Sequence, residues 1–270
     1  KNGSEITEGD ILVQGGAKLQ PMHLGLLSSS GVHSVSVSRR PLVGFFCTGC
    51  ELRSLSCGLE NGQKFSSNSF LLRGLSVQSG ACPVDFGLIE DKKSDLLALF
   101  SKVKKRGLDL LVSTGGMGPG KYDLVRDTFA EAGGTAILTA LEMRPGKSVL
   151  FGLLGKTLFF GLPGPPDAVH TLFTVLVSPA LNAMQGTEKE LPKSIQACLQ
   201  HPINMQHKDV PRLKGGVLRL DGIPSSVRLA GRFEIPNCYI LLYPEQARYR
   251  NGDLVDVYLT APYYYQRMII

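Results

Sequence analysis

The chain reads Ser113-Thr114-Gly115-Gly116-Met117-Gly118-Pro119-Gly120-Lys121-Tyr122-Asp123 between an apolar run at 108–113 and a predicted helix at 122–132. Glycines permit positive φ and let a backbone approach a ligand closely. Their N–H groups, together with those of a following helix N-terminus, can hold a phosphate. The stretch is neither G-x-G-x-x-G nor a Walker P-loop, because no G-K-[ST] follows. It therefore predicts a strand-to-helix turn that binds an anion, with an ordinary structural turn as the alternative.

Apolar runs around this turn alternate with helical patterns. Strands are predicted at 42–47, 82–89, 108–113 and 158–162, and helices at 67–75, 94–106, 122–132 and 169–184. Pro179 is expected to bend or split the last helix. Continuous apolar strands separated by amphipathic helices predict a parallel sheet that is covered on both faces. The ligands of such sheets bind at the carboxyl ends of the strands.

The sequence pattern differs at the two ends of the chain. A short strand at 9–13, a helix at 21–30 and a strand at 32–37 are predicted first. After Gly186, a polar, loop-rich stretch at 187–215 leads into short strands at 216–220, 227–229, 237–243 and 253–259. Short strands with turn signals indicate a small all-β sandwich or barrel. We therefore expect a linker with a short helical segment at 1–38, an α/β domain at 39–187 and a small β domain at 188–270.

Composition excludes several classes of protein. The 270 residues are 43% hydrophobic and 19% charged, which allows a sizeable core in about two domains. No apolar run of ~18 residues occurs and no signal-peptide pattern follows Lys1, so neither a membrane span nor a leader is expected. Six cysteines are too few for a disulfide scaffold, which favours a reduced, cytoplasmic protein. The net charge of +6 favours an anionic small molecule, and no basic stripe indicates nucleic-acid binding.

Cys47-Thr48-Gly49-Cys50-Glu51-Leu52 stands at the end of another predicted strand. Glu51 is a candidate ligand for Mg²⁺ or for a hydroxyl group. The C-x-x-C pattern of Cys47 and Cys50 is compatible with a redox dithiol or half of a metal site. A zinc site would need a second pair at suitable spacing, which the sequence lacks. Buried or incidental thiols are therefore the favoured interpretation.

Three acids each follow a different predicted strand, namely Glu51, Asp91 and Asp123. In a parallel sheet they converge at one edge, beside the glycine-rich turn. Carboxylates next to an anion-binding loop suit a Mg²⁺ ion that bridges phosphate oxygens. Taken alone, Asp91 is a loop acid or a helix cap.

Two further turns carry candidate ligand-binding residues. Met143-Arg144-Pro145-Gly146-Lys147 places two cations in a rigid turn, which suits a small oxyanion, although a solvated basic turn has the same composition. Gly161-Leu162-Pro163-Gly164-Pro165-Pro166 puts a stiff turn at the end of another strand, with a purely structural role as its alternative.

Taken together, these segments resemble the molybdopterin molybdenumtransferase family, which includes bacterial MoeA and the E domain of gephyrin. The family's motifs occur in order and with similar spacing over roughly residues 5–186. Their counterparts are Gly9-Asp10, Arg39-Arg40-Pro41, Cys47–Leu52, Ser66-Ser67-Asn68, Asp91, Ser113–Asp123, Met143–Lys147 and Leu162–Pro166. Weaker matches follow at Pro211-Arg212, Pro236-Asn237-Cys238 and Asn251-Gly252-Asp253.

The resemblance implies a fold and an activity. The fold would be a three-layer, mostly parallel, Mog-like molybdopterin-binding α/β domain followed by a small β-barrel-like domain. The activity would be that of an enzyme of molybdenum cofactor biosynthesis, which inserts molybdate into adenylylated molybdopterin with Mg²⁺. The family also implies a homodimer and a Mog-type adenylyltransferase as partner.

The resemblance further implies roles for individual residues. The pterin phosphate would be bound by Thr114, Gly115, Gly116 and Gly118. Other contacts to the ligand would come from Ser67, Asn68, Pro163 and Gly164. Molybdate or phosphate would be held by Arg144, Pro145, Lys147 and Arg212. The catalytic and metal-binding acids would be Glu51, Asp91 and Asp123.

The chain departs from the family pattern at Cys50 and Ser66, where the family has acids, and at Pro165, where it has Asn. Two lost acids would weaken Mg²⁺ binding. The family's N-terminal segment and mixed domain, which helps form the site across a dimer, are expected to be missing. Two alternatives stay open: a non-catalytic molybdopterin-binding paralogue and, because 115–119 resembles T-G-G-x-G-P, a CinA-like nucleotide-pyrophosphate hydrolase.

Overall fold

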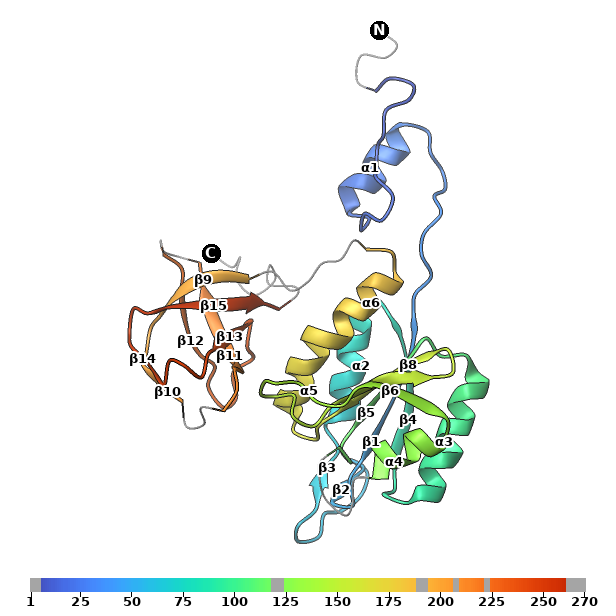
Figure 1. Cartoon of the computed structure of the whole chain (residues 1–270). Coiled ribbons are helices and arrows are strands. Elements are labelled where there is room, and N and C mark those ends of the chain that lie inside the picture. Colours follow the sequence, from blue (N-terminus) through green and yellow to red (C-terminus); the bar gives the residue numbers. More distant parts are fainter. Residues whose placement is uncertain (1–5, 118–123, 188–193, 206–208, 221–223, 261–270) are drawn as a thin grey trace.

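The computed structural model of the chain describes residues 6–117, 124–187, 194–205, 209–220 and 224–260. Figure 1 shows an α/β domain, a small β-barrel and an N-terminal arm that carries one helix. Among the helices of these ranges, none has the length and hydropathy needed to cross a membrane. The α/β domain followed by an all-β domain confirms the predicted fold class.

Six strands form the central sheet, in the order β4-β1-β5-β8-β7-β6. The first four are parallel, as predicted: β4 (Cys82–Ile89), β1 (Leu42–Thr48), β5 (Leu110–Thr114) and β8 (Thr157–Leu162). The inner strands β1, β5 and β8 are mostly buried, whereas β4 at the edge is only partly covered. The sequence pattern missed β7 (Leu150–Leu154), which is antiparallel to both β8 and β6 (Gly134–Leu138). The sheet is therefore mostly parallel, with an antiparallel hairpin at one edge.

Helices cover the two faces of this sheet and make three layers. One core contains α2 (Asn68–Gln78) and α5 (Pro166–Leu172), and the other contains α3 (Lys93–Arg106) and α4 (Leu124–Glu131). Successive residues of a strand point to opposite faces. Along β5, Leu110 and Val112 accordingly lie in the first core and Leu111 in the second, and all three are fully buried. Burial on both faces explains why β5 is apolar without alternation.

The long helix predicted at 169–184 is interrupted as expected. It consists of α5, the π-helical segment η1 (Phe173–Val177) and α6 (Ser178–Met184), with Pro179 in the first turn of α6. Proline has no N–H to donate to the preceding turn, so the ordinary hydrogen-bond ladder cannot continue through it. The wider π turn lies directly before it, and Phe173 and Val177 stay buried in the first core.

The C-terminal strands close into a barrel in the order β11-β12-β9-β15-β13. Its strands are β9 (Ser194–Leu199), β11 (Arg212–Arg219), β12 (Ser226–Leu229), β13 (Cys238–Leu242) and β15 (Leu254–Leu259). Val227, Ile240 and Val257 fill its interior and are fully buried. A small ribbon pairs β10 (Ile203–Asn204) with β14 (Arg248–Tyr249).

The expectation that 187–215 is mainly loop is wrong for β9, β10 and the start of β11. Ser194, Gln196 and Cys198 alternate with apolar residues in β9, a half-buried strand pattern that its polar flanks concealed. The domain boundary between 187 and 188 stays a prediction, and residues 188–193 lie outside the described part of the chain.

In the N-terminal arm, α1 (Pro21–Ser29) confirms the helix predicted at 21–30. The strands predicted at 9–13 and 32–37 are wrong, since neither segment is a strand in the structure. The alternation of Val35 and Val37 with polar residues mimics a strand, but both valines are exposed. A strand needs a neighbour for its backbone groups, and neither segment pairs with another described strand.

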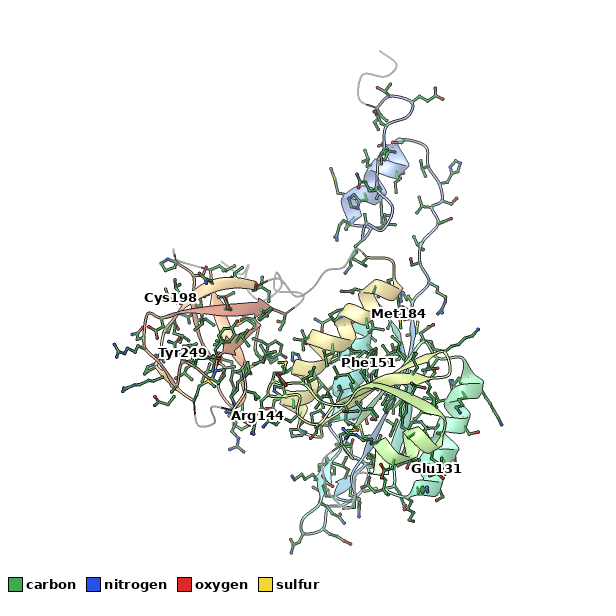
Figure 2. The ribbon with its side chains drawn as sticks, in the orientation of Figure 1. Glu131, Arg144, Phe151, Met184, Cys198 and Tyr249 are labelled. Carbon is green, nitrogen blue, oxygen red and sulfur yellow. The ribbon has the colours of Figure 1, made fainter. Side chains whose placement is uncertain are left out.

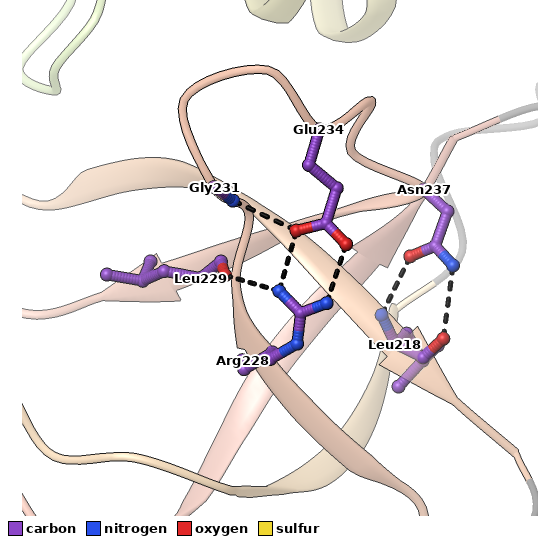
Figure 3. Close-up of polar contacts among 6 residues, drawn as sticks. All are labelled: Leu218, Arg228, Leu229, Gly231, Glu234 and Asn237. Carbon is purple, nitrogen blue, oxygen red and sulfur yellow. Dashed lines mark hydrogen bonds and ion pairs between the residues drawn. The ribbon is translucent and has the colours of Figure 1, made fainter.

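The loop between β12 and β13 is fixed by a bidentate ion pair (Figure 3). Arg228 donates from Nη1 and Nη2 to the two carboxylate oxygens of Glu234, each over 2.6 Å. The Gly231 N–H donates to the same carboxylate over 3.0 Å. The Arg228 contact first, and then the Gly231 N–H, lower the pKa of Glu234 to about 2. The loop is thereby held with the Phe233 side chain 92% exposed.

This ion pair predicts a pH dependence of stability. The Glu234 pKa lies below its ordinary value of 4.5, so the contribution is complete above pH 4.5 and is lost as the pH falls towards 2. We expect Glu234→Gln to reduce the free energy of unfolding near pH 7 and to differ less from wild type as the pH falls. Urea titrations across this range test it, with Glu245→Gln, an exposed glutamate of the same barrel, as the control. A difference independent of pH would contradict the assignment.

Candidate functional site

The carboxyl ends of the four parallel strands meet at one edge of the sheet. The register aligns their last residues, pairing Cys47 with Thr114, Thr48 with Ile89, and Thr114 with Leu162. The connection from β6 to β7 leaves at the same edge, because Leu150 at the start of β7 lies opposite Gly161 near the end of β8. The loops after these strands therefore gather where an open α/β sheet binds its ligands.

The glycine-rich turn after β5 is wedged between β1 and β8. Gly115 has φ +88°, and a Cβ there would overlap the carbonyl oxygen of Thr48. Gly116 has φ +63°, and a Cβ there would lie 2.7 Å from Val125. The Gly115 N–H donates to the Leu162 carbonyl over 3.1 Å. Both glycines are thus required by backbone angle and by space, which the sequence predicted only in general terms.

The other loop residues of the prediction, Gly118 and Asp123, lie outside the described residues. Met117, the last one described before them, is buried. Its side chain packs over Gly161, where a Cβ would lie 2.7 Å from the Met117 sulfur. The start of the loop is therefore anchored in the second core, on the α3 and α4 side of the sheet.

Asn68, the first residue of α2, ties three loops together. Its amide nitrogen donates to the Thr114 hydroxyl over 3.2 Å and to the Gly164 carbonyl over 2.8 Å. Asn68 and Thr114 are 5% and 1% exposed. The Asn68 Oδ1 atom is buried and accepts no hydrogen bond from any described residue. A buried acceptor without a donor is costly, so it marks a place where a ligand or water is expected to donate.

The other predicted residues of this region lie next to Asn68 or Gly164 in the chain. Ser67 precedes α2, is exposed and makes no capping hydrogen bond with its side chain. Pro163 is half-buried and Gly164 is exposed at the end of β8, where the Gly164 carbonyl faces Asn68. The structure thus brings Asn68, Thr114 and Gly164 into one hydrogen-bonded group, with Ser67 and Pro163 next to it in the chain.

The acids are distributed less tightly than predicted. Asp91 is half-buried and its carboxylate accepts a hydrogen bond from the Thr48 hydroxyl, so the end of β1 is tied to the segment after β4. Glu51 is exposed just beyond β1. Within the described ranges no three His, Cys, Asp or Glu side chains lie together as a metal site, and Asp123 is outside those ranges. Thr48 lies inside the Cys47–Leu52 motif but is not among the residues predicted for the site.

The cations lie in the loop between β6 and β7, and an acid from the other domain meets them. The Arg144 guanidinium donates from Nη2 to an Asp209 carboxylate oxygen over 3.0 Å, and the Lys147 ammonium group donates to the same oxygen. Lys147, and after it Arg144, hold the pKa of Asp209 well below its usual range. Sequence reasoning missed Asp209, which lies 62 residues from Lys147 and in no motif.

Arg144 also joins the sheet domain to the barrel (Figure 2). The backbone N–H of Arg144 donates to the Pro211 carbonyl over 2.9 Å. The backbone N–H of Leu213 donates to the Arg144 carbonyl over 2.8 Å. Arg212 is thereby paired with Arg144 as an isolated bridge, with Pro145 next in the chain. The Nε atoms of both arginines are buried and lack a partner among the described residues. Of the predicted cations, Arg144 and Lys147 are thus joined through Asp209, and Arg212 lies beside Arg144 in the backbone at the junction.

A second contact across the junction joins α5 to β13. His170 Nδ1 and the Tyr239 hydroxyl are hydrogen-bonded. Burial raises the pKa of Tyr239 to about 12 and lowers the pKa of His170. Both shifts favour the neutral forms, so this contact needs no counter-charge.

The residues that depart from the family pattern have different surroundings. Cys50 is exposed, whereas Cys47 is buried in β1 with its sulfur 3.5 Å from the Ser69 hydroxyl. All six cysteines are free thiols. Ser66 is 6% exposed, and Pro165 is the residue before α5. An acid at position 66 would be a buried charge, so the serine there removes a desolvation cost along with a ligand.

An apolar pocket of about 250 Å³ lies beside this edge, under the β6–β7 connection. Its walls come from that connection, β7, β8 and the η1–α6 helix, with lining residues that include Leu141, Val149, Phe151, Leu162 and Leu176. The lining offers almost no polar surface. A phosphate or oxyanion would lose its hydration there without compensation, so the pocket is not the anion site.

The family of the chain follows from comparison with known domains. Residues 44–183 match the family described as a probable molybdopterin binding domain, which is just over half of the chain. The chain belongs to this family. The match covers the glycine-rich turn, Asn68 and the β6–β7 connection.

The particular relatives are molybdopterin molybdenumtransferases. The chain is 28% identical to that of Haemophilus influenzae over 94% of its own length and 65% of the relative's. It is 31% identical to that of Bacillus subtilis over 73% of its own length and 45% of the relative's. The MoeA molybdopterin biosynthesis protein of Pyrococcus horikoshii has a similar structure, with a TM-score of 0.81 and 26% identity over 94% of this chain and 63% of that one.

These comparisons confirm the resemblance read from the motifs. The alignments with Haemophilus influenzae and Pyrococcus horikoshii cover nearly the whole chain. The chain spans between about half and two thirds of the length of the relatives it matches.

The wedge at Gly115 predicts a specific mutational cost. We expect Gly115→Ala to destabilise the protein by about 2–4 kcal/mol, because the new methyl group must displace the β1 backbone as well as strain φ. Gly62→Ala is the matched control, since Gly62 has φ +83° but open space around its Cβ position. It should cost only about 1 kcal/mol.

Urea unfolding of the two variants measures this difference. Equal costs for Gly115→Ala and Gly62→Ala would mean that φ alone matters and that β1 does not confine the loop.

Proposed function

We propose that the chain binds adenylylated molybdopterin at the carboxyl edge of its sheet and takes part in inserting molybdate into it. The observation that carries the proposal is the Asn68 group: a buried amide fixed by Thr114 and Gly164, with one acceptor atom unused by the described residues. The glycine turn beside it supplies close backbone approach. An acceptor next to a phosphate-type loop suits a ligand that carries both N–H donors and phosphate, as a pterin phosphate does.

The chemistry required of the protein is mainly positioning. Gly116, with Thr114 and Gly115 next to it and Gly118 in the same loop, would hold the phosphate end, while the Gly115 N–H is used by the Leu162 carbonyl. Arg144, Lys147 and Arg212, next to Pro145, would hold molybdate at the domain junction, because planar and ammonium cations match an oxyanion. The two dithiolene thiols of the substrate would replace an oxo group of molybdate, which would take their protons and leave as water. Attack of a water molecule on the pyrophosphate bond would release AMP and leave the phosphate on the pterin. Fixed charges and dipoles that favour this exchange need no covalent intermediate with the protein.

We propose Mg²⁺ as a partner of the substrate phosphates. Mg²⁺ in nucleotide-type sites is held by one or two carboxylates together with phosphate oxygens and water. Asp91 and Glu51, which follow the paired strands β4 and β1, are the acids that would hold it, with Asp123 as the third. A bound ion would neutralise phosphate charge. Cys50 and Ser66 reduce the acid count, so we expect weak binding in the absence of substrate.

The remaining features of the proposal concern context. All six thiols are free, which supports the reducing cytoplasm as the compartment. We propose a homodimer, and as a partner a Mog-type adenylyltransferase that would supply the adenylylated substrate.

The names of relatives that align through the barrel favour molybdenum insertion over hydrolysis of a nucleotide pyrophosphate. Binding without turnover is the second candidate, and the substitutions at Cys50, Ser66 and Pro165 favour it.

The Asn68 group predicts a loss of binding on truncation. Asn68→Ala removes the unused acceptor and both amide donors, so we expect the affinity for adenylylated molybdopterin to fall about tenfold or more. Fluorescence titration of the bound pterin measures it. Asn251→Ala, at an exposed position in the barrel, is the matched control and should bind like wild type.

The same titrations separate the two candidate functions. Binding together with molybdate-dependent release of adenylate supports insertion, whereas binding without release selects the non-catalytic function. Equal affinity of Asn68→Ala and wild type would contradict the placement of the pterin.

A further inference from the structure

The cationic loop between β6 and β7 is occupied by an acid of the chain itself. One carboxylate oxygen of Asp209 accepts hydrogen bonds from both Arg144 and Lys147. Arg144 and Lys147 belong to the α/β domain, whereas Asp209 precedes β11 of the barrel. A carboxylate oxygen bridging two cations has the same charge and donor pattern as one oxygen of a tetrahedral oxyanion.

The backbone delivers Asp209 to this position. Arg144 exchanges hydrogen bonds with Pro211 and Leu213 over 2.9 and 2.8 Å, so the strand entering the barrel runs alongside the loop. Two residues before Pro211, the Asp209 side chain reaches the cations. The contact therefore accompanies the backbone pairing by which the barrel joins the sheet domain.

The cluster remains open to solvent. The side chains of Arg144, Lys147 and Asp209 are 36%, 49% and 39% exposed. An exposed ion pair contributes little to stability, because water competes for the charges and salt screens them. Separating Asp209 from the two cations is therefore a small step, which a ligand of higher charge can drive.

The cluster also carries more positive charge than the single carboxylate of Asp209 neutralises. Arg144 and Lys147 share one acid, Arg212 is bridged to Arg144 through the backbone, and the Nε atoms of both arginines have no partner among the described residues. A dianion such as molybdate would bring more charge and more acceptor atoms than a carboxylate. It would have to share the cations with Asp209 or displace it, because like charges at contact distance repel.

We propose that Asp209 is an internal competitor of the oxyanion: it neutralises Arg144 and Lys147 in the empty site and is displaced when an oxyanion binds. The inference rests on the proposed function and adds to it an acid that sets oxyanion affinity. Because Asp209 belongs to the barrel, its release would also remove one side-chain contact between the domains. Binding of the oxyanion is thereby coupled to the junction.

The test compares oxyanion binding by the full chain and its Asp209→Asn variant. Asparagine keeps the shape of the side chain and removes its charge. Isothermal titration with molybdate, and separately with sulfate, should show about two- to fivefold tighter binding to Asp209→Asn, the range expected for an exposed pair. Lys147→Gln in the Asp209→Asn background should abolish the gain, because it removes one of the shared cations.

The matched control is Asp85→Asn. Asp85 forms an exposed ion pair with Arg73 over 3.3 Å in the α/β domain, so its substitution changes net charge by the same amount away from the loop. It should leave oxyanion affinity unchanged. Circular dichroism and urea unfolding confirm that each variant is folded. A gain in the Asp85→Asn variant equal to that of Asp209→Asn would overturn the proposal, because overall charge would explain it.

Two other results would also overturn it. Equal affinity in wild type and Asp209→Asn would show that the acid does not compete, and weaker binding in Asp209→Asn would show that it orients the cations. Neither result touches pterin binding at Asn68, which the fluorescence titration reports separately. Failure of this inference is therefore distinguishable from failure of the proposed function.

Discussion

The approach of the Gly115 backbone to the Thr48 carbonyl is the constraint on which the geometry of the site depends. It forces a positive φ at Gly115 and leaves no room for a Cβ, so the turn after β5 lies directly against the end of β1. The same turn is tied to β8 through the Gly115 N–H and the Leu162 carbonyl. The carboxyl ends of the adjacent strands β1, β5 and β8 are thus fixed relative to one another. Asn68 can then bridge Thr114 and Gly164, because both partners are held by the sheet.

The second half of the site is made by the junction with the barrel. A sheet of parallel strands gathers loops at one edge, but the cationic loop of Arg144 and Lys147 comes from the antiparallel hairpin of β6 and β7. Main-chain hydrogen bonds between Arg144 and the strand leading into β11 bring Arg212 and Asp209 to this loop. The two ligands would therefore be held by different elements. The pterin phosphate would be held mostly by loops of the sheet, and the oxyanion by the contact between the domains.

Much of this could be predicted from local sequence, and the reasons are physical. Buried strands such as β1 and β5 are apolar on both faces, and glycines at a strand-to-helix turn mark positive φ, so the sheet and its loop are visible in the pattern. Contacts between distant residues leave no local trace, which is why Asp209 was missed. The alternation of polar and apolar residues misled the prediction of strands in both directions. Val35 and Val37 alternate with polar residues in a segment that pairs with no described strand, and the polar residues around β9 concealed a real strand. The roles of Glu51, Asp91 and Arg212 stay predictions.

The most direct test of the account is a crystal structure of the chain with adenylylated molybdopterin bound. We expect the phosphate to lie against the backbone of Gly115 and Gly116, with a pterin N–H donating to the Oδ1 atom of Asn68. Because that atom is buried and has no donor among the described residues, a ligand donor there would complete its hydrogen bonding. A pterin bound elsewhere, for instance in the apolar pocket beside Phe151, with Asn68 unchanged, would contradict the account.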